Sequence, residues 1–317
     1  SSVVMSSDMN SKNIEAFPMT GGQAGLITNK NFGEATLLST NEKEILDVIS
    51  QGRVPVVTGF QGITENGYFT TLGRGGSDTT ASILGVMLDA ERIEIYTDVD
   101  GVMTADPRIV KSASVIDIIS YDEVFQLADQ GSKVIHSRAV EYAREGNIPI
   151  MIKNTLNDTI GTLINSVGDR KRRRLITSIT NHDDRIQVTI NLDDNKGNDR
   201  YNDVLEILAA NKISLDLINI FPRQQVFTIS KAAKDIVKDI FGKLDLKYTL
   251  IDNCSTIALV GAGMKGIPGV MAKIYKTLSE SNIEVLQTAD SHMTIWCLIH
   301  TENLEKAINA LHKAFKL

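Results

Sequence analysis

The stretch Thr70–Ala90, TTLGRGGSDTTASILGVMLDA, sets three glycines and an arginine directly before an apolar helical pattern. We predict a helix over Thr79–Ala90, and the strand pattern Ile93–Thr97 follows it closely. The same alternation continues on both sides, with strand patterns at Val54–Gly59 and Pro149–Lys153, a helix opened by the capping box of Ser120 and Glu123, and a helix over Val134–Glu145. This alternation predicts an α/β domain with a largely parallel sheet.

The composition is that of a globular protein with room for two or three domains. Of its 317 residues, 42% are hydrophobic and 23% charged, and the net charge of -6 gives no electrostatic reason to bind nucleic acid. No apolar run approaches the roughly 20 residues of a membrane helix, so we expect no membrane partner. Cys254 and Cys297 lie far apart, and the histidines are scattered. We therefore expect neither a disulfide nor a metal site, and a reducing, cytoplasmic compartment.

The second half of the chain repeats one supersecondary pattern. After the basic stretch SVGDRKRRR, residues 186–252 alternate as β-α-β-β-α-β, and residues 255–317 repeat this order without its last strand. The isolated strand pattern Leu175–Asn181 would complete the second copy, which makes the first copy an insertion in the second. The predicted parts are thus residues 1–165, a linker at 166–174, a module at 186–252, and a module of 175–181 plus 255–317.

The glycine-rich stretch has the features of a binding site for a zwitterion. We predict Ser77 as the N-cap, which leaves backbone N–H groups and the positive end of the helix dipole facing an anion. Arg74 offers a bidentate fork for a carboxylate, and Asp78 offers an acceptor for an ammonium group. An ordinary glycine-rich turn with a surface ion pair would explain the same spacing.

Two further stretches carry charged residues beside strand and helix ends. Thr97 ends a predicted strand and Asp98 and Asp100 follow it, at the carboxyl end where open α/β sheets bind ligands. Asp98 and Asp100 suit Mg²⁺ or a ribose. Arg108 and Lys133 suit phosphate groups, and Lys133 stands at a predicted helix start that a bound phosphate would explain. Alternatively, the residues from Asp98 to Arg108 form ordinary turns and bind no ligand.

With these residues laid out, the chain resembles the aspartokinases of the amino-acid kinase family over essentially its whole length. The matching motifs are FPMTGGQAGL (17–26), VVTGFQG (56–62), TTLGRGGSDTTA (70–81), YTDVDGVMTADPR (96–108), GSKVIH (131–136), IPIMIKN (148–154), VGAGMKGIPGVMAKI (260–274) and LQTADSHMTIWCLI (286–299). The resemblance implies a parallel-rich sheet sandwiched by helices, followed by two ferredoxin-like ACT domains, the first inserted into the second. It implies transfer of the ATP γ-phosphoryl group to the β-carboxylate of L-aspartate, the first step toward lysine, threonine, methionine and diaminopimelate.

The resemblance also implies roles for single residues. Arg74 would hold the α-carboxylate of aspartate, with Ser77 beside it and Asp78 near the ammonium group. ATP would bind as its Mg²⁺ complex, a substrate rather than a tightly bound cofactor, beside residues Thr97, Asp98, Met103, Arg108 and Lys133. Met103 stands where many relatives carry an aromatic residue, which weakens any stacking role.

The ACT modules imply regulation by an end-product amino acid. We expect a homodimer built through these modules and an effector site formed by Met264, Ile267, Pro268, Gly269, Val270, Gln287, Asp290 and Ser291. Pro268 is expected in the first turn of a helix over Pro268–Ser281, and strands are expected at Ile283–Thr288 and Met293–His300. Lysine, threonine and diaminopimelate remain open as effectors.

Two family features are missing from the chain. The resemblance implies a Lys-Phe-Gly-Gly-Thr-Ser segment that holds the phosphoryl group, and a substrate-binding Gly-Glu pair placed just before the position that matches Ser1; neither is present in this sequence. We therefore expect this chain alone to lack kinase activity. A non-catalytic regulatory chain is the main alternative, although the nucleotide-side motifs argue against it. A kinase acting on glutamate derivatives is a second alternative, which the paired ACT modules disfavour.

Overall fold

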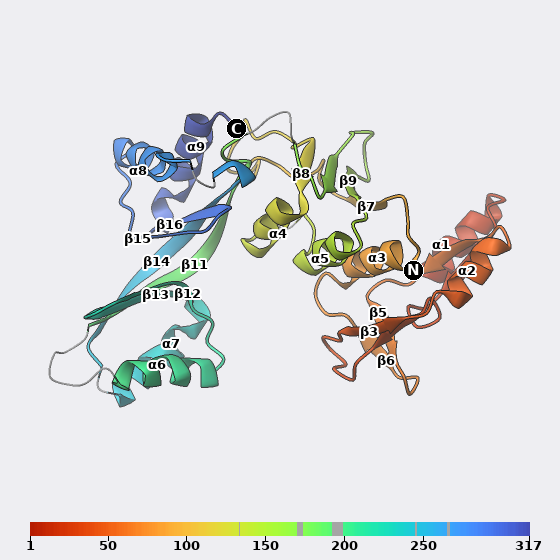
Figure 1. Ribbon diagram of the computed structural model, residues 1–317, viewed down its shortest axis with the longest axis horizontal. Helices are drawn as coiled ribbons and strands as arrows, with labels where there is room; N and C mark the ends of the chain where they lie inside the picture. The colour runs from red at the N-terminus through yellow and green to blue at the C-terminus, as the bar shows by residue number, and fades with distance from the viewer. Residues whose placement is uncertain (133, 170–173, 192–198, 245, 265–266) are drawn as a thin grey trace. The chain divides into compact units, whose positions relative to one another are not determined.

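The computed structural model describes residues 1–132, 134–169, 174–191, 199–244, 246–264 and 267–317 (Figure 1). The chain forms two compact units. The first contains Ser1–Val102 and Val115–Arg172, and the second contains Met103–Ser114 and Arg173–Leu317. The short segment Met103–Ser114 therefore packs with the C-terminal unit, although a division of the chain at residue 165 would place it in the first. Among the described residues, no helix has both the length and the apolar character that a membrane crossing requires.

The first unit is a mixed α/β structure in which parallel pairs are prominent. Strand β1 pairs in parallel with β4, β7 with β9, and β8 with β10, while the β2–β3 and β5–β6 pairs are antiparallel. Its strands are β1 Ala16–Met19, β2 Leu26–Thr28, β3 Leu37–Thr40, β4 Val54–Val57, β5 Gln61–Thr64, β6 Phe69–Thr71, β7 Ile93–Thr97, β8 Ile118–Ser120, β9 Ile150–Asn154 and β10 Thr162–Asn165. Its helices are α1 Ser2–Ser11, α2 Lys43–Ser50, α3 Gly76–Met87, α4 Tyr121–Asp129 and α5 Ser137–Glu145.

Local capping decides where these helices begin. The capping box predicted for α4 is confirmed, because the Ser120 hydroxyl accepts from the Glu123 N–H while the Glu123 carboxylate accepts from the Ser120 N–H. Helix α5 begins at Ser137 rather than at Val134, because His136 is its N-cap. Helix α3 begins at Gly76, three residues before the predicted start at Thr79, because Gly75 takes a left-handed conformation and caps the helix.

The second unit is built on one six-stranded antiparallel sheet of order β12-β13-β11-β14-β16-β15. The strands are β11 Ser178–Asn191, β12 Asp216–Phe221, β13 Gln224–Ser230, β14 Tyr248–Val260, β15 Gln287–Asp290 and β16 Thr294–His300. The helices are α6 Asp199–Ala210, α7 Lys234–Lys243, α8 Val270–Glu280 and α9 Leu304–Phe315.

Strands β11 and β14 each run through both repeats of this unit. Residues Ser178–His182 of β11 pair with Thr256–Val260 of β14, and Gln187–Ile190 pair with Tyr248–Ile251 across register shifts. The predicted strand Leu175–Asn181 and the first strand of the module at 186–252 are therefore parts of one strand, β11, with a bulge where Asp184 has a positive φ of 57°. The bulge lets the same two strands serve two helical layers, since α6 and α7 lie on one half and α8 and α9 on the other (Figure 1).

The core beneath α8 and α9 is aliphatic. Ile257, Leu259, Ile274 and Cys297 are fully buried in it, and burial raises the pKa of the Cys297 thiol to about 12. Such a thiol is inert at neutral pH, and Cys297 fills the core as a small apolar side chain.

Acidification is expected to destabilise this unit through His312, which is buried and has its Nε2 atom 2.9 Å from the Thr104 hydroxyl. Burial first, and then the positive charge of Arg174, lower the pKa of His312 below its ordinary value of 6.5. The unfolded state then binds more protons as the pH falls below 6.5, so the free energy of unfolding decreases there and is unaffected above it. Urea unfolding followed by the fluorescence of Trp296 at pH 7.5 and pH 5.5 measures the loss, and His312→Gln should reduce it. An equal loss in both proteins would contradict the assignment.

Candidate active site

The centre of the candidate site is the first turn of α3. Gly75 is its N-cap, with a φ of 70°, and the Gly76 N–H donates to the carbonyl of Gly73. Ser77 is therefore not the N-cap that the sequence predicted; it is the second residue of the helix. The N–H groups of Ser77 and Asp78 occupy first-turn positions that have no partner within the helix, so this turn can hold an anion as expected.

Two other loops contact this turn so closely that only glycine fits at two of its positions. A Cβ atom on Gly75 would lie 2.2 Å from the His136 ring, and one on Gly76 would lie 2.5 Å from the ring of Phe60. Phe60 follows β4, and its N–H donates to the Thr80 hydroxyl. The loop after β4 and the loop before α5 thus meet at the α3 turn, and only glycine allows that approach.

The charged groups at the turn differ in exposure. Arg74 and Ser77 are exposed, while Asp78 is partly buried and accepts a 3.4 Å hydrogen bond from the His136 N–H. Burial raises the pKa of Asp78, and the His136 N–H partly offsets this. Burial, and then the charges of Arg138 and Arg74, lower the pKa of His136, and the Asp78 carboxylate partly offsets this. The turn therefore offers an exposed guanidinium at its rim and a carboxylate behind it.

A second group of polar residues lies at the carboxyl ends of β7 and β9. The parallel register sets Thr97 opposite Asn154, and the Thr97 hydroxyl donates to the exposed Asp98 carboxylate. Asp100 accepts from the side-chain amides of Asn157 and Asn154, at 2.9 and 2.7 Å, which lowers its pKa. Asn154 has no predicted role, although its place at the end of a predicted strand is the feature that marks it as a candidate.

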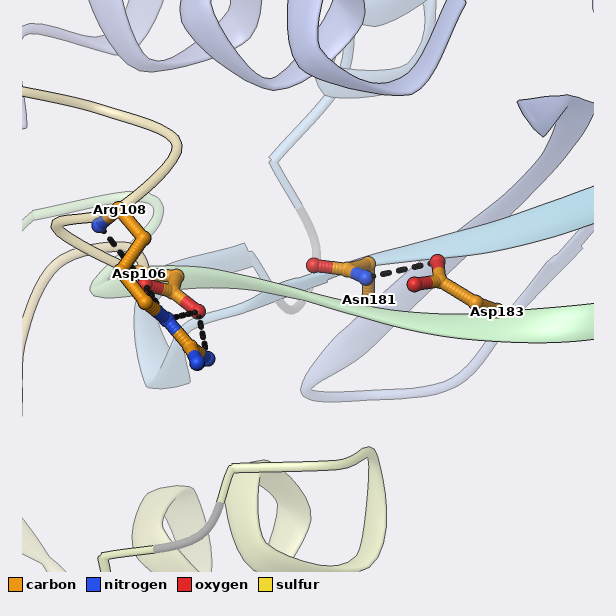
Figure 2. A network of polar contacts seen from close by, with 4 residues as sticks. All are labelled: Asp106, Arg108, Asn181 and Asp183. Atoms are coloured by element: carbon orange, nitrogen blue, oxygen red, sulfur yellow. Dashed lines mark hydrogen bonds and ion pairs between the residues drawn. The ribbon is translucent and has the colours of Figure 1, made fainter. Parts of the chain in front are cut away.

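The remaining nucleotide-side candidates lie apart from these strand ends along the chain. Met103 and Arg108 belong to the segment that packs in the second unit, where Arg108 forms a bidentate ion pair with Asp106 at 2.6 Å (Figure 2). Lys133 lies outside the described residues. The structure thus groups Arg74, Ser77 and Asp78 at one turn and Thr97 with Asp98 at another.

The predicted effector residues lie at the start of α8 and at the edge strand β15. Helix α8 begins at Val270, and Gly269 is its left-handed N-cap, so Pro268 precedes the helix instead of lying in its first turn. Met264 and Val270 are buried, while Ile267 is exposed. At the start of α8, the side chain of Ile267 is therefore open to solvent, whereas Met264 and Val270 belong to the buried apolar core.

The β15 side of the predicted effector site differs from the expectation in one respect. Strand β15 begins at Gln287 rather than at Ile283, and the Gln287 amide donates to the carbonyl of Leu217 and to the side chain of Asn219. Gln287 is thus bound to β12, while Asp290 and Ser291 at the other end of the strand are exposed.

Comparisons with known proteins agree with this arrangement. Residues 2–154 match the amino acid kinase family, and residues 249–313 match the ACT domain. Aspartokinase 1 of Bacillus subtilis is 40% identical, with all of this chain and 80% of that protein aligned. The aspartokinase of Corynebacterium glutamicum is 35% identical over 96% of this chain and 75% of its own length.

Solved structures show the same fold over the whole chain. E. coli aspartokinase III in complex with aspartate and ADP superposes with a TM-score of 0.80 at 26% identity, covering 100% of this chain and 73% of that one. The same enzyme in complex with lysine and aspartate gives a TM-score of 0.80 at 25% identity, covering 99% and 72%. The chain belongs to the aspartokinase family.

Proposed function

We propose that the full-length enzyme carries out the aspartate kinase reaction, in which the γ-phosphoryl group of ATP passes to the β-carboxylate of L-aspartate, and that this chain supplies the aspartate and nucleotide contacts described below. The observation that carries the proposal is the α3 turn, where an exposed arginine, first-turn backbone N–H groups and a carboxylate lie within five residues, Arg74–Asp78. The acceptor carboxylate is already ionised at neutral pH, so the reaction needs no general base. Positioning of the substrates and neutralisation of charge then supply most of the catalysis.

On the aspartate side, Arg74 binds the α-carboxylate through its guanidinium fork, and Ser77 supports the same group from the helix turn. Asp78 faces the ammonium group of the substrate. An ammonium group beside this partly buried carboxylate would stabilise its charged form and so offset the burial that raises its pKa.

On the nucleotide side, ATP binds as its Mg²⁺ complex near Thr97 and Asp98, where two parallel strands end. Asp100, kept ionised by two amide groups, is a second acceptor for the ribose or for water bound to Mg²⁺. Phosphate contacts for Arg108 and Lys133, and a nucleotide contact for Met103, are proposed from the aspartokinase-like motifs YTDVDGVMTADPR and GSKVIH that contain them.

The experiment is formation of aspartyl phosphate by the full-length enzyme, trapped as the hydroxamate. We expect product with aspartate and much less with glutamate. Asp98→Asn should weaken the binding of MgADP in calorimetry, whereas Asp122→Asn, which changes a surface ion pair with Arg144, should not. A folded enzyme that forms no aspartyl hydroxamate, yet binds an amino acid in its C-terminal unit, would instead be a regulatory chain.

Regulation is proposed to occur through the C-terminal unit, by an amino-acid effector bound at the start of α8 in a homodimer. The space around Gly269 is open, since a Cβ atom there would meet no other atom within 4 Å. Its backbone precedes the first-turn N–H groups of a helix, which suit a carboxylate. Ile267, Pro268, Asp290 and Ser291 are exposed and can contribute to the same site.

Light scattering and calorimetry test the regulatory proposal. We expect a dimer that binds one of lysine, threonine or diaminopimelate, because an effector at a dimer seam favours one arrangement by its differential affinity. Ser291→Ala should weaken that binding, whereas Ser279→Ala on α8 should not. A monomer that binds none of the three would rule the proposal out.

A further inference from the structure

Arg138 is a partly buried arginine near the start of α5 that joins two segments of the first unit. Its Nη1 atom donates to the carbonyl of Leu72 at 2.8 Å, and its Nη2 atom donates to the carbonyl of Ala35 at 3.3 Å. Leu72 and Ala35 are both fully buried. A guanidinium carries its N–H groups in one rigid plane, so this single side chain sets the spacing of the two carbonyls.

The two carbonyls belong to segments that also pair through their backbones. The Ala35 N–H donates to the carbonyl of Thr71 at 2.8 Å, which holds the loop before β3 against the end of β6. Leu72 is the last residue before Gly73, where the chain takes a left-handed φ of 75°. Arg138 therefore binds the last carbonyl before the chain turns toward α3.

The α3 turn begins directly after this carbonyl. Gly73 and Arg74 follow Leu72, and the Gly73 carbonyl accepts from the Gly76 N–H at 3.1 Å. A displaced Leu72 carbonyl would therefore move Arg74 together with the start of the helix.

The same end of α5 also contacts the turn beyond Arg74. His136, two residues before Arg138, packs on Gly75, and its N–H donates to the Asp78 carboxylate at 3.4 Å. The Arg138 N–H in turn donates to Nδ1 of His136 at 3.3 Å. Arg138 and His136 thus hold the chain before and after Arg74, and all of these residues lie in the first unit.

We propose that Arg138 is a positioning residue for aspartate binding: by binding the carbonyls of Leu72 and Ala35 it fixes the α3 turn, and thereby Arg74, for the α-carboxylate of the substrate. This rests on the proposed function. Arg138 acts through the backbone of the turn, because its guanidinium is bonded to these two carbonyls. If Arg138 served stability alone, its loss would not separate the two substrates. If it positions Arg74, its loss weakens aspartate binding and spares MgATP, which is proposed to bind at the ends of β7 and β9.

A pocket of about 580 Å³ beside Arg138 allows a test by chemical rescue. Its lining includes the carboxylates of Glu34, Glu141 and Glu145, which attract a cation. In Arg138→Ala, a free guanidinium ion can therefore enter the space of the missing side chain and donate to the same two carbonyls. In Arg138→Met, the methionine side chain fills that space and offers no donor.

The test is steady-state kinetics of the full-length enzyme with both substrates varied. For Arg138→Ala we expect the KM for aspartate to rise about fivefold to thirtyfold, the scale of losing one hydrogen bond, with the KM for MgATP unchanged. Guanidinium chloride, far below the concentrations that unfold proteins, should lower the raised KM, whereas equal concentrations of NaCl should not. Arg138→Met should show the same rise without rescue. Arg138→Lys, which keeps the charge but not the fork, should lie between wild type and Arg138→Ala.

Tyr121→Phe is the matched control, because it removes a buried hydrogen bond to a backbone carbonyl in the same unit, that of Ile148 at 2.7 Å. It should lower thermal stability without changing either KM. The inference is overturned if Arg138→Ala and Tyr121→Phe have the same kinetics, if Arg138→Ala raises both KM values alike, or if guanidinium lowers neither. Absence of aspartyl phosphate in the wild type would overturn the proposed function instead. If Arg138→Ala fails to fold, Arg138→Met and Arg138→Lys decide by the same comparison of the two KM values.

Discussion

Replacing Arg74 by alanine is expected to raise the KM for aspartate about 30- to 1000-fold, because a charge-assisted bidentate contact contributes roughly 2–4 kcal/mol. The KM for ATP should change by no more than about twofold, since the arginine lies at the α3 turn and not at the strand ends that carry Thr97 and Asp98. Initial-rate kinetics with each substrate varied at saturation of the other measure both effects.

Two further variants make this test specific. Arg74→Lys keeps the charge but not the fork, and should lie between wild type and Arg74→Ala. Arg144→Ala removes an exposed arginine that pairs with Asp122 at 3.0 Å on the surface, so it should leave both constants unchanged. Equal effects of Arg74→Ala on both substrates would mean that Arg74 does not bind aspartate.

Replacing Gly75 by alanine is expected to lower kcat/KM for aspartate about 100-fold, the scale of a displacement of about 1 Å at a binding site. The new Cβ atom would lie 2.2 Å from Cγ of His136, so the ring or the turn must move. Movement of the turn displaces Arg74 and the N–H groups of Ser77 and Asp78 together. The left-handed backbone adds about 1–2 kcal/mol of destabilisation.

Gly52→Ala is the control for this variant. Gly52 has a similar φ of 76°, and a Cβ atom there would meet nothing within 4 Å. Gly52→Ala should therefore lower the free energy of unfolding in urea by the cost of the left-handed backbone, while kcat/KM for aspartate stays unchanged. If Gly75→Ala and Gly52→Ala had the same stability and the same kinetics, the packing of His136 on the turn would not affect the reaction with aspartate.

The sequence by itself determined the family, the α/β character and the residue types proposed for the candidate site. The alternation of strands and helices, the Ser120 capping box and the glycines around Arg74 are local signals. Each depends on the backbone preferences of neighbouring residues and not on contacts with distant parts of the chain, so the sequence alone reveals it. Local signals were less reliable at element ends. Ser77 is a good N-cap by type, yet Gly75 caps α3, because glycine takes the left-handed conformation without strain while His136 packs against it.

Tertiary structure alone decided which distant segments meet. The Gln287 amide is bound to β12, and Asn154 holds Asp100, because pairing and packing bring together side chains that no spacing rule relates. The placement of Met103–Ser114 is the clearest case. Its apolar residues, such as Ala105 and Val110, could join any core, and the choice followed from complementary packing and hydrogen bonds with α9 and β11, 75 to 208 residues away. Contacts over such separations depend on the whole fold, so they leave no periodic trace in the sequence.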